Sequence, residues 1–401
     1  MVVELGGTVG DIEGLPFLET IRQIRHELGK SRVMNVHVTL LPYIKAAGEL
    51  KTKPTQHSVQ ELRRIGISPN MLILRAEQPV PSDLKRKIAY NCDVDEDSVI
   101  EAVDASTIYS VPLNFMSQDI LKPISKQLEL GDIKPNMDQW INLVNRIIMP
   151  SNEVKIAFVG KYLDLKESYK SLTEALIHAG ANLDSRVNIK WVDSEKIEED
   201  GSEKYLKDCD GILVAGGFGE RGVEGKIEAI KYARENKIPF LGICLGMQLS
   251  IIEFGRNVLG LDDVNSVEFK NDAKNPMIYL IDEFIDSSGK RQIRTTTSPL
   301  GGTLRLGEYE CETKEGSNLR AAYNEAIIFE RHRHRYEANP KYRDELEKHG
   351  MIITGESNGL IEAVEVKDHP WFLGVQFHPE FTSRLQNPNP AILSFVKASM
   401  K

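Results

Sequence analysis

A cysteine between two glycines is the strongest candidate for chemistry in this sequence. Cys244 lies in the run IPFLGICLGMQ, flanked by Gly242 and Gly246. The apolar residues before it predict a short strand, and the apolar periodicity after it predicts a helix that begins at Leu245. This is the cysteine form of the G-x-S-x-G turn, which presents a nucleophile at a helix N-terminus where the dipole favours thiolate. The pattern therefore predicts a nucleophile rather than a buried structural cysteine.

Two partners for this cysteine occur near the C-terminal end of the sequence. The run FLGVQFHPEF reads as a strand followed by His378 and Glu380. A cysteine nucleophile needs a base that takes its proton and later delivers it to the leaving amine, and the imidazole needs an acidic group that fixes its tautomer. We therefore predict a catalytic triad of Cys244, His378 and Glu380.

A glycine-rich loop is expected at the same edge of the sheet. The run DGILVAGGFG reads as a buried strand that ends in glycines, and parallel strands present their C-terminal ends together. The N–H of Gly217 and the amide of Leu245 are candidates to hold a tetrahedral oxyanion, although a plain turn is the alternative.

A charged run further along the chain, IIFERHRHRY, reads as one strand over 327–336. Alternation would place Arg331, Arg333 and Arg335 on one face and His332 and His334 on the other. An arginine there could grip a substrate carboxylate with two hydrogen bonds. A metal site built on the two histidines lacks further obvious ligands.

Helices and strands alternate along most of the chain, which predicts an α/β fold. The first half reads as helices at 16–28, 59–65 and 82–90 and strands at 33–41, 71–75 and 98–103. The second half opens with a strand at 154–160, a helix at 168–179 and a strand at 187–192. We predict two doubly wound, mostly parallel-sheet domains, 1–128 and 154–401, joined by a helical linker at 129–153. The N-terminal domain is expected to be incomplete, because Val2 to Leu5 reads as the end of a strand.

Two stretches of the first half could bind a nucleotide. Glu4 ends the apolar run at the N-terminus, and Asp11 and Glu13 lie in the glycine-rich stretch that follows. The run LKTKPTQHS reads as a loop whose lysines, hydroxyls and amides suit a triphosphate. Solvated surface turns are the alternative for both stretches.

The charge and composition of the sequence argue against several classes of protein. The net charge of -9 over 401 residues argues against nonspecific nucleic-acid binding. The four cysteines form no C-x-x-C pair and no zinc spacing, which fits a reducing cytoplasm. The N-terminal run has no basic region before an apolar one, and no segment is long and apolar enough to span a membrane.

Several motifs resemble known families. GICLGMQ, GGFG and QFHPEF resemble the class I, triad-type glutamine amidotransferases, which hydrolyse glutamine and pass on ammonia. ELGGTVGDIEGLPF, GELKTKPTQHS, RGVEGKIEA and ERHRHRYE resemble the CTP synthase family, and the likeness spans essentially the whole chain. That resemblance implies ATP-dependent amination of UTP to CTP, the last step of CTP biosynthesis. It also implies Mg²⁺, feedback inhibition by CTP, activation by GTP and a homotetramer that can form filaments, with no nucleic-acid or membrane partner.

The resemblance also assigns roles by position. In the first half it implies a magnesium ligand at Glu4, an ATP pocket at Val103, Asp104 and Ala105, and a UTP/CTP site at Asp11, Ile12, Glu13, Lys51, Thr52, Lys53, Pro54, Thr55, Gln56 and Lys87. In the second half it implies a glutamine site at Gly217, Leu245, Gly246, Met247, Gln248, Glu268 and Arg335, and a GTP site at Lys170 and Arg294.

One departure from the family and two alternatives stay open. The family begins with a segment that holds a phosphate loop, and no G-x-x-x-x-G-K-[ST] pattern occurs here, so we expect the synthetase half to lack its phosphate cradle. The chain could instead be the glutaminase of another ATP-dependent amidotransferase, or a non-catalytic nucleotide-binding assembly fragment.

Overall fold

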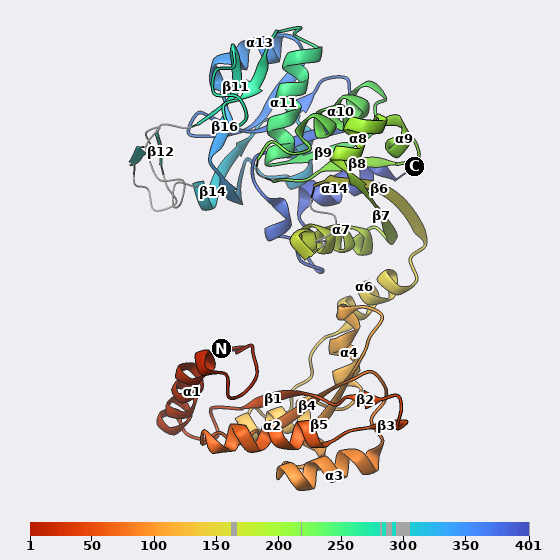
Figure 1. Ribbon diagram of the computed structural model, residues 1–401, viewed down its shortest axis with the longest axis vertical. Helices are drawn as coiled ribbons and strands as arrows, with labels where there is room; N and C mark the ends of the chain where they lie inside the picture. Colours follow the sequence, from red (N-terminus) through yellow and green to blue (C-terminus); the bar gives the residue numbers. More distant parts are fainter. Residues whose placement is uncertain (162–166, 218, 281–282, 286–290, 294–304, 401) are drawn as a thin grey trace. The chain divides into compact units, whose positions relative to one another are not determined.

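The structure is a computed structural model that describes residues 1–161, 167–217, 219–280, 283–285, 291–293 and 305–400. Its contacts divide the chain into two compact units, Met1–Val144 and Asn145–Lys401, and we describe each by itself. In Figure 1 the first unit runs from red to orange-yellow and the second from yellow to blue. No helix among the described residues combines the length and the apolar character needed to cross a membrane.

The first unit is built on a parallel sheet. Its strand order is β1 (Val36–Leu40), β4 (Met71–Ala76) and β5 (Val99–Val103), and Leu72 and Leu74 of the central strand are fully buried. The predicted alternation of helices and strands is confirmed here. The remaining elements are α1 (Leu15–Leu28), β2 (Tyr43–Ile44), β3 (Glu49–Leu50), α2 (Lys53–Arg64), α3 (Ser82–Cys92), α4 (Val111–Met116), α5 (Leu121–Leu128) and α6 (Asp138–Ile148).

Two predictions for the first unit were wrong. Residues 2–5 form no strand, because they pair with no neighbouring strand of the described sheet. The run at 50–58 is not a loop, because α2 begins at Lys53, six residues earlier than the predicted helix at 59–65. Pro54 occupies the first turn, where its missing N–H costs no helical hydrogen bond, so the proline starts the helix and does not interrupt it.

The second unit is built on a mixed sheet. Among the described residues its strand order is β15-β14-β17-β18-β19-β9-β8-β6-β7. The pairs from β19 to β7 are parallel and those from β15 to β19 are antiparallel. The α/β fold class is confirmed, and β19 joins the two halves of the sheet. The strands are β6 (Asn152–Gly160), β7 (Ser185–Asp193), β8 (Gly211–Val214), β9 (Phe240–Ile243), β14 (Arg305–Thr313), β15 (Ile327–His334), β17 (Met351–Ser357), β18 (Leu360–Val366) and β19 (Phe372–Val375).

Helices cover both faces of this sheet (Figure 1). Two buried apolar clusters lie on its two sides, one against α8, α10 and α11 and the other against α7, α12 and α14. These helices and the smaller elements are α7 (Lys170–Asn182), α8 (Ser194–Asp200), α9 (Glu203–Leu206), α10 (Val223–Glu235), α11 (Leu245–Asn257), β10 (Val264–Ser266), β11 (Asn275–Leu280), β12 (Glu283–Ile285), β13 (Arg291–Ile293), α12 (Asn318–Tyr323), β16 (Tyr336–Ala338), α13 (Arg343–Lys348) and α14 (Pro390–Ser399).

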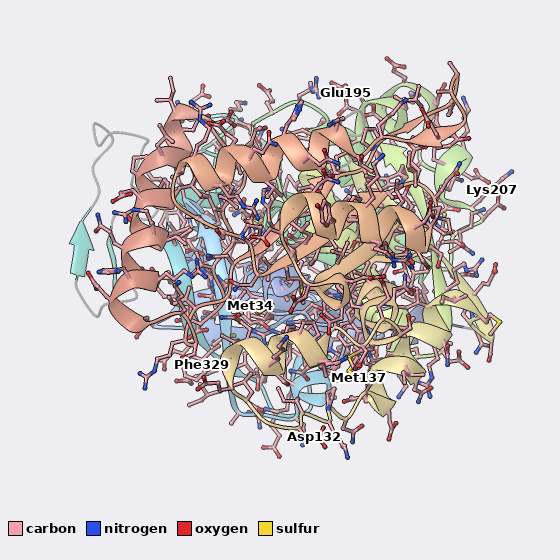
Figure 2. The ribbon with its side chains drawn as sticks, turned by 90° about the horizontal axis from the view of Figure 1, so that it is seen from below. Met34, Asp132, Met137, Glu195, Lys207 and Phe329 are labelled. Carbon is pink, nitrogen blue, oxygen red and sulfur yellow. The ribbon has the colours of Figure 1, made fainter. Side chains whose placement is uncertain are left out.

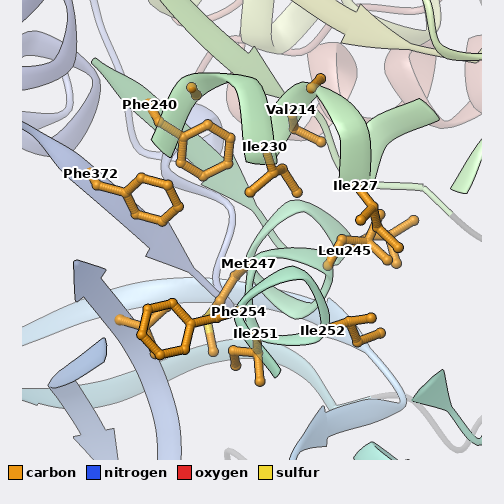
Figure 3. Close-up of a cluster of buried hydrophobic side chains, with 14 of the residues drawn as sticks. Val214, Ile227, Ile230, Phe240, Leu245, Met247, Ile251, Ile252, Phe254 and Phe372 are labelled. Carbon is orange, nitrogen blue, oxygen red and sulfur yellow. The ribbon is translucent and has the colours of Figure 1, made fainter. Parts of the chain in front are cut away.

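The first of these clusters anchors the turn at Cys244. Figure 3 shows Leu245 and Met247 of α11 packed among side chains of β8, α10 and β9, and the rings of Phe240 and Phe372 stack with centroids 4.4 Å apart. Charged side chains such as Lys207 project from the surface (Figure 2). A buried apolar base of this kind fixes the backbone on which the candidate site is built.

The predicted strand 327–336 is divided in the structure. Alternation holds as far as β15 extends: Arg331 and Arg333 are exposed, while His332 and His334 are buried. β15 ends at His334, and Tyr336 begins β16, which pairs with β11 in a different sheet. Arg335 therefore lies between two strands, so the prediction that one strand carries all three arginines was wrong.

Candidate active site

The turn at Cys244 has the predicted form. β9 ends at Ile243, α11 begins at Leu245, and Cys244 adopts φ 53° and ψ -104°, a strained conformation for a residue with a side chain. A Cβ at Gly246 would lie 2.3 Å from the carbonyl oxygen of Val214, and one at Gly242 would lie 2.8 Å from the backbone of Gly246. Both glycines are therefore required for the close approach of helix and strands.

Register brings Cys244 beside β19, the strand that precedes His378. β9 and β19 run parallel with Ile243 opposite Val375, and the N–H of Cys244 donates to the carbonyl of Val375 over 2.7 Å. The amide of Gln376, which is fully buried, donates to Cys244 Sγ over 3.6 Å. Gln376 was missed by sequence reasoning, because only the pairing of the two strands places it at the sulfur.

His378 and Glu380 complete the triad geometry. His378 Nδ1 lies 2.8 Å from Glu380 Oε1, in a turn that follows β19. Burial acts to lower the pKa of His378, but the charges of Glu380 and Cys244, together with hydrogen bonds to both, raise that pKa to about 10. The ring of Phe381 stacks on the imidazole with centroids 5.3 Å apart. The three predicted triad residues are therefore brought together.

A buried carboxylate supports the turn that carries His378. Glu330 accepts hydrogen bonds from Tyr323 Oη (2.6 Å), Thr382 Oγ1 (3.0 Å) and Asn389 Nδ2 (2.6 Å). Burial raises the pKa of Glu330 to about 7 against the lowering effect of these donors. Because Asn389 also caps α14 by accepting from Ala391 N–H, Glu330 links β15, α12, the catalytic turn and α14.

The glycine loop after β8 lies between the catalytic pair and two lysines. A Cβ at Gly216 would be 3.3 Å from His378 Cε1 and 3.5 Å from Cys244 Cβ. A Cβ at Gly217 would be 3.5 Å from Lys161 Cε and 3.6 Å from Lys226 Nζ. Sequence reasoning missed both lysines. Lys226 lies in the run VEGKIEAI, for which we predicted no element, so nothing in the sequence marked it as buried.

The predicted glutamine-binding residues gather around this loop. Leu245, Gly246, Met247 and Gln248 form the buried first turn of α11, and the Gln248 amide donates to Tyr336 O (2.8 Å) and Gln376 Oε1 (3.0 Å). Glu268 Oε1 accepts from Gly219 N–H over 3.0 Å. Burial raises the pKa of Glu268, while Gly219, Lys161 and Arg335 act to lower it, so Arg335 lies within electrostatic range of this carboxylate.

In the first unit, the predicted UTP/CTP residues fall into two groups. The first is the start of α2, where Thr52, Thr55 and Gln56 are buried and Lys53 and Pro54 are exposed. Lys51 forms an ion pair with Glu49 and, with Lys87, lowers the pKa of that carboxyl, so the two cations lie near one another.

The second group lies on the turn at 8–14. Asp11 accepts the N–H of Thr8 over 2.8 Å, and Ile12 and Glu13 are exposed. The turn lies beside α2, since a Cβ at Gly10 would be 3.5 Å from Glu61 Cγ.

At the other predicted sites the described residues show only isolated polar contacts. Asp104, at the end of β5 between Val103 and Ala105, accepts from Arg75 over 2.7 Å. Glu4 is exposed, and no group of three metal-ligating side chains occurs in the part of the chain that the structure describes. Lys170, at the start of α7, lies 3.6 Å from Glu167, and Arg294 lies outside the described residues.

Comparisons with known proteins give matches to both units of the chain. The sequence model for the CTP synthase N-terminus matches residues 1–130, and that for class-I glutamine amidotransferases matches residues 164–398. A CTP synthase of Sulfurimonas denitrificans is 68% identical over 401 residues, which is 100% of this chain and 74% of that protein. One of Wolinella succinogenes is 67% identical over 402 residues, covering 100% of this chain and 73% of that protein.

A solved structure resembles the second unit. The glutaminase domain of Trypanosoma brucei CTPS with bound acivicin is 38% identical to this chain, with a TM-score of 0.55. The match covers 61% of this chain and 93% of that domain.

Proposed function

The chain belongs to the CTP synthase family, and on that premise we propose that its second unit hydrolyses glutamine and its first unit uses the ammonia and ATP to aminate UTP to CTP. The observation that carries the glutaminase half is the convergence of Cys244, His378 and Glu380 at the ends of two adjacent parallel strands. As a family member the chain is a glutamine-dependent ligase of pyrimidine nucleotide biosynthesis.

The proposed hydrolysis proceeds through a thioester. The Cys244 thiolate attacks the γ-carbonyl carbon of glutamine, and the carbonyl electron pair moves onto oxygen. The His378 imidazolium, held by Glu380, gives its proton to the leaving amine, so the C–N bond breaks and ammonia departs. A water molecule then attacks the thioester while His378 takes its proton, and glutamate leaves as the thiolate returns.

The remaining second-unit residues would bind and orient glutamine. Gly217 and the amide of Leu245 are the proposed donors to the oxyanion, which gains charge only in the transition state. Glu268 and Arg335 suit the two ends of an amino acid, because a carboxylate pairs with an ammonium and a guanidinium with a carboxylate. Gln248 would act through its bonds to Tyr336 and Gln376.

For the first unit we propose a UTP site, shared with inhibitory CTP, at the start of α2, Lys87 and the turn at 11–13. Lys51 and Lys87 supply neighbouring positive charge for a triphosphate. Val103, Asp104 and Ala105 would border ATP. Glu4 offers Mg²⁺ a single carboxylate, so metal binding there depends on nucleotide phosphates for most of the oxygens that Mg²⁺ requires. GTP activation through Lys170 and Arg294 is a further proposal.

We keep the domain organisation that we proposed from the sequence: a synthetase domain at 1–128, a linker at 129–153 and an amidotransferase domain at 154–401. Within this linker α6 is continuous across the boundary between the two compact units. We also propose a homotetramer, possible filaments and a cytoplasmic location. The location is supported by four cysteines that form no disulfide.

Glutamate release by the wild-type chain and by Cys244→Ala tests the glutaminase assignment. We expect the substitution to lower the rate at least about 1,000-fold, because removing a triad nucleophile removes the whole covalent route. Equal rates in the two proteins would refute the assignment. CTP formation from UTP, ATP and glutamine, measured in the same preparations, tests the synthetase half separately.

Two other functions predict different results. A glutaminase that serves another synthetase would be stabilised against heat by a purine monophosphate and not by UTP or CTP. An assembly module without catalysis would change its size with CTP while releasing no glutamate. The family membership favours the first proposal over both.

A further inference from the structure

We propose that the amine of Lys226 positions the glycine loop 215–217 for binding the oxyanion, which makes Lys226 a positioning residue for glutamine hydrolysis. This inference rests on the proposed glutaminase function and adds a residue that touches neither the substrate nor the nucleophile.

Lys226 is an unusual residue for its place in the fold. It lies on α10, and its side chain is fully buried. Its amine donates to the carbonyl oxygen of Ala215 over 3.0 Å. A methionine of similar length would fill this space without the cost of burying an amine, so packing alone does not account for a lysine here.

The contact fixes one end of the loop that faces the nucleophile. The carbonyl of Ala215 and the N–H of Gly216 belong to one planar trans peptide and point in opposite directions. Holding the Ala215 oxygen on Lys226 therefore fixes the peptide that leads into Gly216, and the next residue is Gly217, the proposed oxyanion donor. At the other end, Lys161 Nζ donates to the carbonyl of Gly219 over 3.2 Å.

The loop held in this way lies directly against the catalytic residues. Gly216 faces His378 and Cys244, and Gly217, one residue later, faces the two lysines. The loop thus faces the predicted triad at Gly216 and the buried amine at Gly217. An error of about 1 Å in the placement of a reacting group can cost roughly 100-fold in rate, so a loop without side chains of its own needs such support.

The electrostatic surroundings of the amine place it near Lys161 and Cys244. Burial and repulsion from Lys161 lower the pKa of Lys226 to about 7, and attraction to Cys244 opposes the shift. The hydrogen bond of the amine is to the carbonyl oxygen of Ala215, at the start of the loop.

The test compares Lys226→Met with Lys231→Met. The control removes a partly exposed lysine from the same helix. We expect Lys226→Met to lower kcat for glutamine hydrolysis about 100-fold and to change KM less than about threefold. An aldehyde analogue of glutamine, which forms a tetrahedral adduct with the cysteine, should bind more weakly by a similar factor. Alkylation of Cys244 by iodoacetamide needs no oxyanion site and should stay within about twofold of wild type.

Three results would overturn the proposal: kcat within about threefold of wild type, unchanged affinity for the aldehyde, or alkylation that slows in proportion to kcat. Lys226→Gln keeps a donor and loses the charge, and we expect a loss of about tenfold with normal alkylation. If Lys226→Met does not fold, Lys226→Gln is the deciding variant. A wild-type kcat and a wild-type affinity for the aldehyde in Lys226→Gln would refute the positioning role. Because the aldehyde assay needs no turnover, it tests Lys226 even if the wild-type chain releases no glutamate.

Discussion

The sulfur of Cys244 receives a hydrogen bond from Gln376, and this bond should matter most when the sulfur is charged. Hydrogen bonds to charged groups contribute about 1.5–3 kcal/mol. We expect Gln376→Leu to lower kcat/KM for glutamine about tenfold and to slow the alkylation of Cys244 by iodoacetamide at pH 7 by a similar factor. Gln376→Asn is the matched control for polarity, since it keeps the amide but is too short to reach the sulfur. If the leucine variant alkylates at the wild-type rate, the bond has no role in activating Cys244.

At the residue scale, the sequence was sufficient to predict those site residues whose type and spacing indicate their chemistry. Cys244, His378 and Glu380 were predicted in this way, and the structure brings them together. Gln376 and Lys226 could not be predicted, because their contacts cross from one strand to another and from a helix to a loop. Such contacts depend on register and packing, which leave no local signature.

At the scale of elements, the glycines of the turn at Cys244 lead to a prediction about the packing of α11 against β8. Gly246→Ala places a Cβ 2.3 Å from the carbonyl oxygen of Val214, so α11 must move away from β8. We expect a loss of about 2–4 kcal/mol in the free energy of unfolding and a glutaminase rate reduced at least 100-fold. Gly14→Ala is the control, because a Cβ there meets no atom within 4 Å. Wild-type stability and activity in Gly246→Ala would show that the turn tolerates a side chain.

The carboxylate that links β15 to the catalytic turn predicts a pH dependence of stability. The pKa of Glu330 is about 7 in the folded chain and 4.5 without the fold, so its contribution is fully present below 4.5 and is lost as pH rises toward about 7. The difference of about 2.5 units corresponds to at most about 3–4 kcal/mol. We expect the stability of the wild type to fall relative to Glu330→Gln between pH 4.5 and 7.

Denaturation followed by the fluorescence of the buried Trp371 measures this difference in the second unit. The result that contradicts the prediction is a constant gap between the two proteins across that pH range. It would mean that Glu330 is already ionised in the folded chain at low pH.

At the scale of elements, periodicity predicted most helices and strands, and it failed where local chemistry was ambiguous. The run at 50–58 reads as a loop because of its proline, yet Pro54 starts α2. The run at 327–336 has unbroken alternation, yet β15 ends at His334 because Tyr336 pairs with β11. In the first place the proline was compatible with a loop and with a helix start, and in the second place tertiary pairing ended the strand.

For the whole molecule, the two compact units should respond to different ligands. We expect UTP with MgCl₂ to raise the melting temperature reported by Trp140, in the first unit, by several degrees at about 100 times its Kd. Lys87→Gln should lose at least half of this shift, because it removes one of two neighbouring cations. Lys126→Gln is the control, since it removes an exposed lysine paired with Asp95 in the same unit. Equal shifts in both variants would place the nucleotide elsewhere.

The pairing of β9 with β19 has a consequence for how this fold can be altered. The nucleophile and its base are far apart along the chain, but their spatial relation is set by Ile243 lying opposite Val375. The exposed loops that connect the elements between these strands are therefore free to vary in length. Such a loop could be lengthened or shortened, and the chemistry should survive as long as the two strands stay adjacent and in register.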